Sequence, residues 1–411
     1  MNNKTLTISE IRTLLEMAAK DLNCQVQELT INKLEPYISE RQLKRNGGLP
    51  LLKSAYYPDD DKALVEIKKA KLEKNYINKL ENKLSDKNLF EQTITSTIAK
   101  LAPIKIKSFK YNKKQKINRQ ISLVLSDLHF GSDIKSKETG KHDFGKVEES
   151  RRLARVIKEV LDYKPEYRNE TSLNLLILGD VIENKLHDIQ DAAPIAEQCA
   201  RAIHLLTQAI AHCSENFPKV NVLFASGNHG RLTSRHPNRA TNQKWDSIET
   251  IIYYAVKTSL KNVKNIKFDL PMTPYVTYSV FGKNILCTHG DSMLNVGYPG
   301  KTIQTGSIET QINKINAALP DVEEYSVVIV GHVHVSSVTH LNNGVVLITN
   351  GALVPVNEFA VSIGIMESAA GQMMFESIEG FPVGDCRYIR VSAKDDKDKS
   401  LDELIEPWKN L

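Results

Sequence analysis

The stretch that decides the fold is Ile121-Ser122-Leu123-Val124-Leu125-Ser126-Asp127-Leu128-His129. A mostly apolar run stops abruptly at an Asp-x-His sequence, which predicts a buried strand that ends in a loop with polar side chains. Residues two apart on an extended chain point the same way, so Asp127 and His129 can reach one site.

The same pattern recurs along the chain. Strand-like runs at 173–178, 220–225, 285–288 and 326–330 end in Gly179-Asp180, Gly227-Asn228-His229, His289-Gly290 and Gly331-His332-Val333-His334. A further strand is expected at 345–349, and helical periodicity at 147–163 and 195–213 separates the early strands. This alternation predicts an α/β domain, in which polar strand ends are expected to converge.

The residue types at these ends indicate metal chemistry. Imidazoles, carboxylates and an amide oxygen suit two divalent ions of the manganese, iron or zinc kind. Two ions roughly 3.5–4 Å apart can clamp a phosphate and lower the pKa of a bridging water. Asp180 is the expected bridging ligand because a carboxylate has two oxygens. The glycines before Asp180, Asn228 and His332 are expected to let the backbone turn sharply.

Taken in order, these five motifs resemble the calcineurin-like metallophosphoesterase superfamily over residues 120–385. The resemblance implies a four-layer α/β sandwich, in which two mixed sheets are flanked by helices. It implies one metal held by Asp127, His129, Asp180 and His334, and another held by Asp180, Asn228, His289 and His332. Mn²⁺ is the expected ion, with Zn²⁺, Fe²⁺ and Mg²⁺ as alternatives. His229 is implied to contact the scissile phosphate rather than a metal.

At two positions the sequence differs from one branch of that superfamily, and these differences limit the possible substrate classes. Its protein Ser/Thr phosphatases carry an arginine soon after Gly-Asp and an acidic residue after Asn-His. Here Val181-Ile182-Glu183-Asn184 and Gly230-Arg231 stand at those places, which argues against a protein phosphatase. His187, in the loop after Asp180, is a candidate acid. Three arginines near His229 either grip flanking phosphates or belong to an exposed loop: Arg231, Arg235 and Arg239.

The charge is divided unevenly. Residues 1–120 hold 24 Lys and Arg against 14 Asp and Glu, whereas the remainder holds 30 against 35. No acidic residue occurs between Glu91 and Asp127, where eight basic residues and two aromatic ones, Phe109 and Tyr111, occur. Such a segment attracts polyanions such as DNA, and a solvated linker is the alternative.

Four regions are expected: a helical domain over 1–100, a basic linker over 101–119, a catalytic domain over 120–390 and a C-terminal tail over 391–411. Residues 9–22 have helical periodicity, and a second helix is expected to stop at Gly47-Gly48. This part is either a helix-turn-helix-like module or a plain helical bundle. A long charged helix over 59–100 either dimerises as a coiled coil or packs on the rest of the chain.

Composition places the chain among soluble globular proteins, with 41% hydrophobic and 25% charged residues. It has neither an apolar run of membrane-spanning length nor a signal-peptide core at its start. Its five scattered cysteines are expected to be reduced thiols. Together these features predict a cytoplasmic protein.

The sequence supports three functional hypotheses. The first is a DNA nuclease that uses a metal-activated water, with His229 assisting the leaving oxygen. It would resemble the nuclease subunit of double-strand-break repair complexes and related phage or bacterial exonucleases. The second is a phosphoesterase for nucleotides or cyclic nucleotides, with N-terminal helices that serve oligomerisation. The third is a DNA-binding or scaffold protein with a vestigial site, and the intact ligand set speaks against it.

Overall fold

The computed structural model describes residues 8–34, 36–38, 106–107, 109, 116–140, 143–184, 192–232, 244–299, 302–320, 323–357, 360–361 and 369–409. The chain divides into two compact units, Met1–Gln92 and Thr93–Leu411. The expected turn at Gly47-Gly48, the charged helix over 59–100 and most of the basic linker lie outside the described residues. The helix-turn-helix, coiled-coil and DNA-contact interpretations therefore stay predictions.

The described part of the first unit is helical. It consists of α1 (Ile8–Asp21), the short 3-10 helix η1 (Val26–Glu28) and α2 (Ile31–Leu34). Leu15 and Ala18 on α1 pack with Leu29, Leu34 and Ile38 in one apolar cluster. The helix predicted at 9–22 is confirmed, because its apolar residues recur at the spacing that places them on one face.

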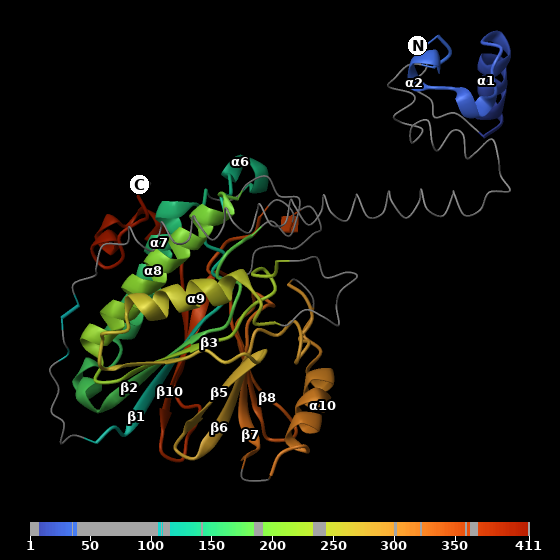
Figure 1. The fold of residues 1–411 in the computed structure, drawn as a ribbon. Helices are drawn as coiled ribbons and strands as arrows, with labels where there is room; N and C mark the ends of the chain where they lie inside the picture. Colours follow the sequence, from blue (N-terminus) through green and yellow to red (C-terminus); the bar gives the residue numbers. More distant parts are fainter. Residues whose placement is uncertain are drawn as a thin grey trace. The chain divides into compact units, whose positions relative to one another are not determined.

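The second unit contains two mixed sheets (Figure 1). The first has the order β11-β10-β1-β2-β3-β4 and the second β5-β6-β7-β9-β8. The strands are β1 (Arg119–Leu125), β2 (Thr171–Ile177), β3 (Val220–Phe224), β4 (Ile266–Asp269), β5 (Tyr275–Val280), β6 (Lys283–Thr288), β7 (Tyr325–Val330), β8 (Ser337–His340), β9 (Val346–Thr349), β10 (Gly371–Ile378) and β11 (Cys386–Arg390). Every predicted strand is present within two residues of its expected bounds.

Helices cover the outer faces of both sheets and complete four layers (Figure 1). The helices α7 (Lys146–Asp162), α8 (Ile195–Asn216) and α9 (Ile248–Ser259) lie on the first sheet. On the second sheet, α10 (Thr305–Asn316) packs Ile308 and Ile312 against Leu286 and Val328. The short α6 (Ser136–Thr139) and the 3-10 helix η2 (Pro165–Glu170) lie in connections. The predicted α/β sandwich is thereby confirmed.

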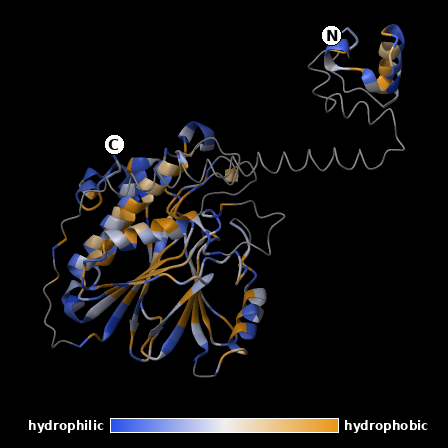
Figure 2. Ribbon diagram, in the orientation of Figure 1, coloured by the Kyte–Doolittle hydropathy of each residue, from blue (hydrophilic) through white to orange (hydrophobic). Residues whose placement is uncertain are grey.

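Apolar side chains of both sheets pack into one buried cluster. In Figure 2 the strands carry many hydrophobic residues, coloured orange. Val124 and Leu176 from the first sheet join Ile285, Val327 and Ile329 from the second in one buried cluster. Burial on this scale is the main stabilising contribution to such a domain. No helix in the described parts of the chain is long and apolar enough to cross a membrane.

Strand direction places the polar strand ends together. β1, β2 and β3 are parallel neighbours, with Leu125 beside Ile177 and Ile177 beside Phe224. In the second sheet β6 and β7 are also parallel. Because parallel neighbours end at the same edge of a sheet, the five motifs follow strand ends on a shared side of the sandwich.

The segment expected as a C-terminal tail is tied to the second unit. It forms the 3-10 helices η4 (Asp395–Lys397) and η5 (Lys399–Glu403), which contact α7. Arg152 of α7 is 1% exposed and donates to both carboxylate oxygens of Asp396 at 2.7 and 2.8 Å. Leu401 and Ile405 are buried. Residues 391–409 are thus part of the folded unit rather than an appendage.

Candidate metal centre

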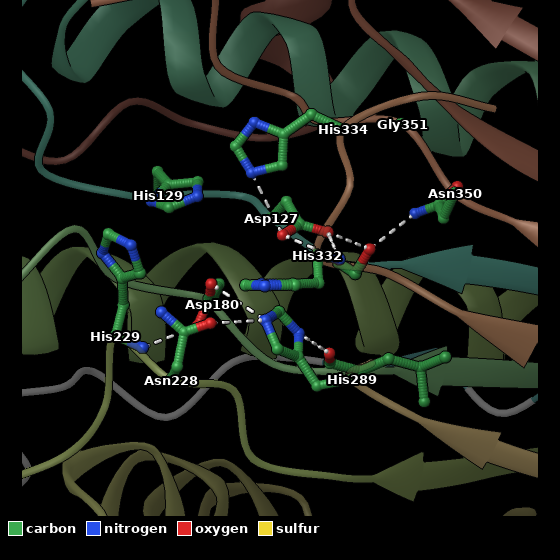
Figure 3. A network of polar contacts seen from close by, with 12 residues as sticks. Asp127, His129, Asp180, Asn228, His229, His289, His332, His334, Asn350 and Gly351 are labelled. Carbon is green, nitrogen blue, oxygen red and sulfur yellow. Dashed lines mark hydrogen bonds and ion pairs between the residues drawn. The ribbon is translucent and has the colours of Figure 1, made fainter. Parts of the chain in front are cut away.

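The loops after β1, β2, β3, β6 and β7 converge on one buried site (Figure 3). Potential ligand atoms form three groups, and the atoms inside each group lie within 4.8 Å of one another. The groups are Asp127 with His129 and His334, Asp180 with His129 and His229, and Asp180 with His289 and His332. These groups contain six of the seven predicted ligands together with His229, and the seventh, Asn228, contacts His289. The convergence expected from the sequence is what the fold produces.

Asp127 holds one side of the site in place. Its carboxylate lies 3.2 Å from Nε2 of His334 and accepts the backbone N–H of His332 at 3.0 Å. Ser126 Oγ donates to the same carboxylate at 2.6 Å. These contacts fix the orientation of Asp127 from two different sheets.

Asp180 holds the other side. Its Oδ1 accepts the backbone N–H of His229 at 2.7 Å, and its Oδ2 lies 3.0 Å from His289 Nε2. The same His289 nitrogen lies 3.1 Å from Oδ1 of Asn228. His289 Nδ1 contacts the carbonyl of Leu178 at 2.8 Å, and since a carbonyl can only accept, Nδ1 is the donor. Nε2 is thereby turned toward the oxygen ligands, as in histidines that bind metals.

His129 shows that this polar site fits a cation. Its Nε2 is buried and has no hydrogen-bond partner among the described residues, while its Nδ1 lies 2.8 Å from Oε2 of Glu183. A buried polar nitrogen without a partner is costly unless something else binds there. The surrounding set of imidazoles and carboxylates suits divalent manganese, iron or zinc. The residues present therefore fit a metal centre, with Asp180 shared between two ligand groups.

The backbone at the site adopts conformations that ordinary residues avoid. Five of the nine described non-glycine residues with positive φ are predicted ligands: Asp127, His129, Asp180, His332 and His334, at 48–70°. Left-handed backbone at such residues costs free energy and is concentrated at functional sites. The packed strands that precede these loops hold the conformation in place.

The glycines of the motifs act in two different ways. Gly179 has φ of +84°, so it provides the sharp turn that the sequence predicts. Gly331 does not have positive φ; instead, a Cβ there would lie 2.5 Å from Oγ of Ser126 and 2.7 Å from Oδ2 of Asp127. Gly227 similarly admits Asp180 Oδ1, which a Cβ would approach to 2.1 Å. The chain bends directly after Gly227 and Gly331, as expected, but without positive φ, so close approach of other residues is what requires glycine there.

Charges at the site polarise one another strongly. Burial opposes ionisation of Asp127, yet His334 and His289 lower its pKa to about 2. Burial lowers the pKa of His289, but the Asp180 carboxylate outweighs it and raises that pKa to about 10. Burial and the neighbouring His289 lower the pKa of His332 to about 4. Bound cations would take the place of the protons on such imidazoles.

Two buried acids that the sequence analysis did not single out support the ligand loops. Glu249 of α9 accepts the backbone N–H groups of Val181 and Gly227, both at 2.6 Å. It therefore joins the loop after β2 to the loop after β3. Glu183 contacts His129 and accepts a hydrogen bond from Ser132 Oγ at 2.9 Å. Glu183 stands three residues after Asp180 and could have been suspected, whereas Glu249 has no local signal.

A buried amide network supports Asp127 from behind. Asn350, labelled in Figure 3, follows β9. Its Nδ2 donates to Ser126 Oγ at 2.9 Å and to Gln372 Oε1 at 2.9 Å. Gln372 Oε1 also accepts the backbone N–H of Ser126 at 3.0 Å. Buried polar groups that satisfy one another in this way give a rigid arrangement.

Glu149 of α7 is expected to make the stability of the metal-free protein depend on pH. Its Oε2 accepts the N–H of Gly131 at 2.9 Å, and burial raises its pKa to about 7. Because the pKa of this carboxyl is higher in the folded than in the unfolded state, the protonated group stabilises the fold. This contribution is complete below the pKa of the unfolded state and is lost as pH rises through the folded-state pKa of about 7. With EDTA present, the free energy of unfolding of the wild type should fall between pH 4.5 and 7. In Glu149→Gln this fall should be smaller by on the order of 1–3 kcal/mol.

Urea denaturation at several pH values measures this difference. Glutamine keeps an acceptor for the N–H of Gly131, so the variant is matched in shape. Parallel pH profiles for the wild type and Glu149→Gln would contradict the prediction. Glu148→Gln, on the same turn of α7 but less buried, is the control and should keep the wild-type profile.

The remaining candidate residues differ in how far they are described. His229 is 8% exposed, its Nδ1 donates to the carbonyl of Glu183 at 2.6 Å, and its ring packs edge-on against His129 at 4.6 Å. Arg231 is half-buried two residues further on, where its carbonyl accepts from Asn184 Nδ2 at 3.1 Å. His187, Arg235 and Arg239 lie outside the described residues, so their roles stay predictions.

Comparison with known proteins gives structural likenesses at low similarity. No family model matches the chain, and neither does any of the curated proteins. A Vps29 mutant from Entamoeba histolytica is 9% identical, with a TM-score of 0.29, over 66% of this chain and 99% of that one. A dimetal phosphatase from Danio rerio is 11% identical, with a TM-score of 0.32, over the same shares.

A 5'-nucleotidase precursor from Thermus thermophilus is 12% identical, with a TM-score of 0.30, over 70% of this chain and 57% of that one. At these identities and TM-scores the activities of such proteins do not transfer to this chain. What the site does is therefore inferred from its own residues.

Proposed function

We propose that this protein is a two-metal phosphoesterase that hydrolyses phosphodiester bonds of DNA. The observation that carries the proposal is the position of Asp180, which belongs both to the group with His129 and His229 and to the group with His289 and His332. A shared carboxylate between two imidazole-rich groups is an arrangement that holds two cations side by side.

Seven side chains would hold the cations. Asp127, His129 and His334 would serve one ion, and Asn228, His289 and His332 the other, with Asp180 common to both. When bound, two divalent ions polarise phosphate oxygens and lower the pKa of water between them. Contacts from Ser126 and the His332 N–H hold Asp127, and the Leu178 carbonyl holds His289, so the ligand atoms are already aimed.

His229 would act on the phosphate rather than on a metal. Its Nδ1–H donates to the Glu183 carbonyl at 2.6 Å, which fixes the orientation of the ring beside His129 and Asp180. A ring held in this way can stabilise charge on a phosphate oxygen or deliver a proton to the leaving oxygen. Arg231, close behind it in the chain, would contact a flanking phosphate.

The choice of DNA rests on the charge of the N-terminal part. The run without acidic residues between Glu91 and Asp127 carries eight basic side chains. Each Lys or Arg contact with a phosphate releases condensed counterions, so the segment would bind a polymer far better than a mononucleotide. Arg41, Lys44 and Arg45, next to Gly47-Gly48, would contribute further phosphate contacts.

Manganese-dependent hydrolysis of labelled single- and double-stranded DNA, compared with mononucleotides, tests the proposal. Cleavage of DNA that stops with EDTA supports it. Hydrolysis of mononucleotides or cyclic nucleotides alone would favour the small-molecule alternative. Absence of hydrolysis on every phosphoester, with metal bound, would contradict the enzyme assignment.

Deleting residues 1–115 should separate polymer binding from chemistry. The deletion removes six of the eight basic residues but keeps Lys116 and Arg119, and the Arg119 side chain pairs with Glu376 at 2.6 Å in the first sheet. We expect kcat/KM on DNA to fall by about 10²-fold or more at 0.15 M salt, while bis(p-nitrophenyl) phosphate hydrolysis stays within about twofold. An equal loss on both substrates would contradict a DNA-binding role for this region.

A further inference from the structure

Exposed apolar side chains occur on the loops of the metal centre. In the described part of the second unit, Leu232 is 57%, Tyr298 54% and Val335 39% exposed. Leu232 follows His229 by three residues, Val335 directly follows His334, and Tyr298 lies on the loop after β6 that begins with His289. Single exposed apolar residues are ordinary, but loops that surround a polar catalytic centre have no structural reason to expose several.

Tyr298 is the one whose distance from the site is defined. Its ring centroid lies 6.1 Å from that of His332, and the two rings are inclined by 58°. His332 belongs to the group formed with Asp180 and His289. Tyr298 is 54% exposed, so part of its ring is accessible to solvent close to His332, one of the proposed metal ligands.

From this geometry we infer that Tyr298 stacks on a nucleobase of the nucleotide that flanks the scissile phosphate, on the His332 side. The inference rests on the proposed function and narrows its substrate. Bases stack on aromatic side chains irrespective of sequence, because every base has a π-face. A base inside a duplex is already stacked on both sides, so Tyr298 selects single-stranded or frayed DNA.

The test compares Tyr298→Ala, Tyr298→Phe and the wild type, as full chains with Mn²⁺. Substrates are a single-stranded thymidine oligonucleotide and one of the same length built from abasic nucleotides. We expect Tyr298→Ala to raise KM on the thymidine substrate about tenfold, with kcat within about twofold. Tyr298→Phe should keep the wild-type KM, because the ring stacks and the hydroxyl is not needed.

The abasic substrate distinguishes base stacking from other effects of the substitution on KM. With no base to stack, the wild type and Tyr298→Ala should have equal KM values on it. Phe381→Ala is the matched control, because Phe381 is 63% exposed but far from the site. Phe381 pairs with Ile378, and Ile378 pairs with Arg119 at the start of β1, the end of the strand opposite the metal centre. This variant should behave as the wild type.

Three results would overturn the inference. They are an unchanged KM for Tyr298→Ala on thymidine, an equal rise on the abasic substrate, and a loss with Tyr298→Phe as large as with alanine. Failure of the proposed function is seen separately, because the wild type itself would then hydrolyse neither oligonucleotide.

Discussion

Replacing His229 by alanine is expected to lower hydrolysis of DNA by about 10²–10⁴-fold, while the purified protein keeps two metal ions per chain. The reason is that the seven proposed ligands remain, whereas the ring that would act on the phosphate is removed. The backbone N–H of residue 229 should still donate to Asp180, so this carboxylate, the proposed bridging ligand, should keep its position.

Elemental analysis after dialysis, together with single-turnover kinetics, measures both halves of this prediction. His340→Ala, at an exposed histidine of β8, is the control and should retain both metal and activity. A potential ligand atom of His229 also lies within 4.8 Å of those of Asp180 and His129. Loss of one metal ion from His229→Ala would therefore reassign it as a ligand.

Replacing Arg152 by alanine is expected to destabilise the second unit by about 3–5 kcal/mol. The side chain is buried and fully engaged: it makes two bonds to Asp396 and a third, at 2.9 Å, to the carbonyl of Leu353. The N–H of Leu353 in turn donates to the carbonyl of Asp127 at 3.0 Å. Removing Arg152 thus leaves Asp396 without its partner and loosens the segment that holds a ligand residue.

Urea unfolding followed by tryptophan fluorescence measures this effect, since both tryptophans, Trp245 and Trp408, lie in the second unit. Arg155→Ala on the same helix is the control. Arg155 is 37% exposed and pairs with Glu159 at 2.8 Å, so its loss should cost about 1 kcal/mol or less. Similar losses for both variants would contradict the role given to the buried pair.

Local sequence patterns predicted much of the second unit. β1, β2, β3, β6 and β7 were expected because apolar runs that stop at a polar tip are readable without any knowledge of the partner strands. β10 was missed, although it is the antiparallel neighbour of β1. Its sequence, Gly371–Ile378, mixes polar and apolar residues, and only its place between β1 and β11 buries Gln372 and Ser377.

The site shows the same division. Asp180 and His289 could be named from their motifs, whereas Glu249 could not, because its function arises from contact with Val181 and Gly227, far away in the chain. The sequence could likewise not show why residue 331 is a glycine. A side chain there would collide with Ser126 and Asp127, which follow another strand.

The amino-acid sequence by itself determined which side chains follow the strands and which chemistry they offer, because strand ends and residue types are local properties. Tertiary structure alone decided which groups share Asp180, which nitrogen of His289 faces the oxygen ligands, and which buried acids hold the loops. Those features depend on contacts between residues distant in the chain, and burial then sets their charges and orientations.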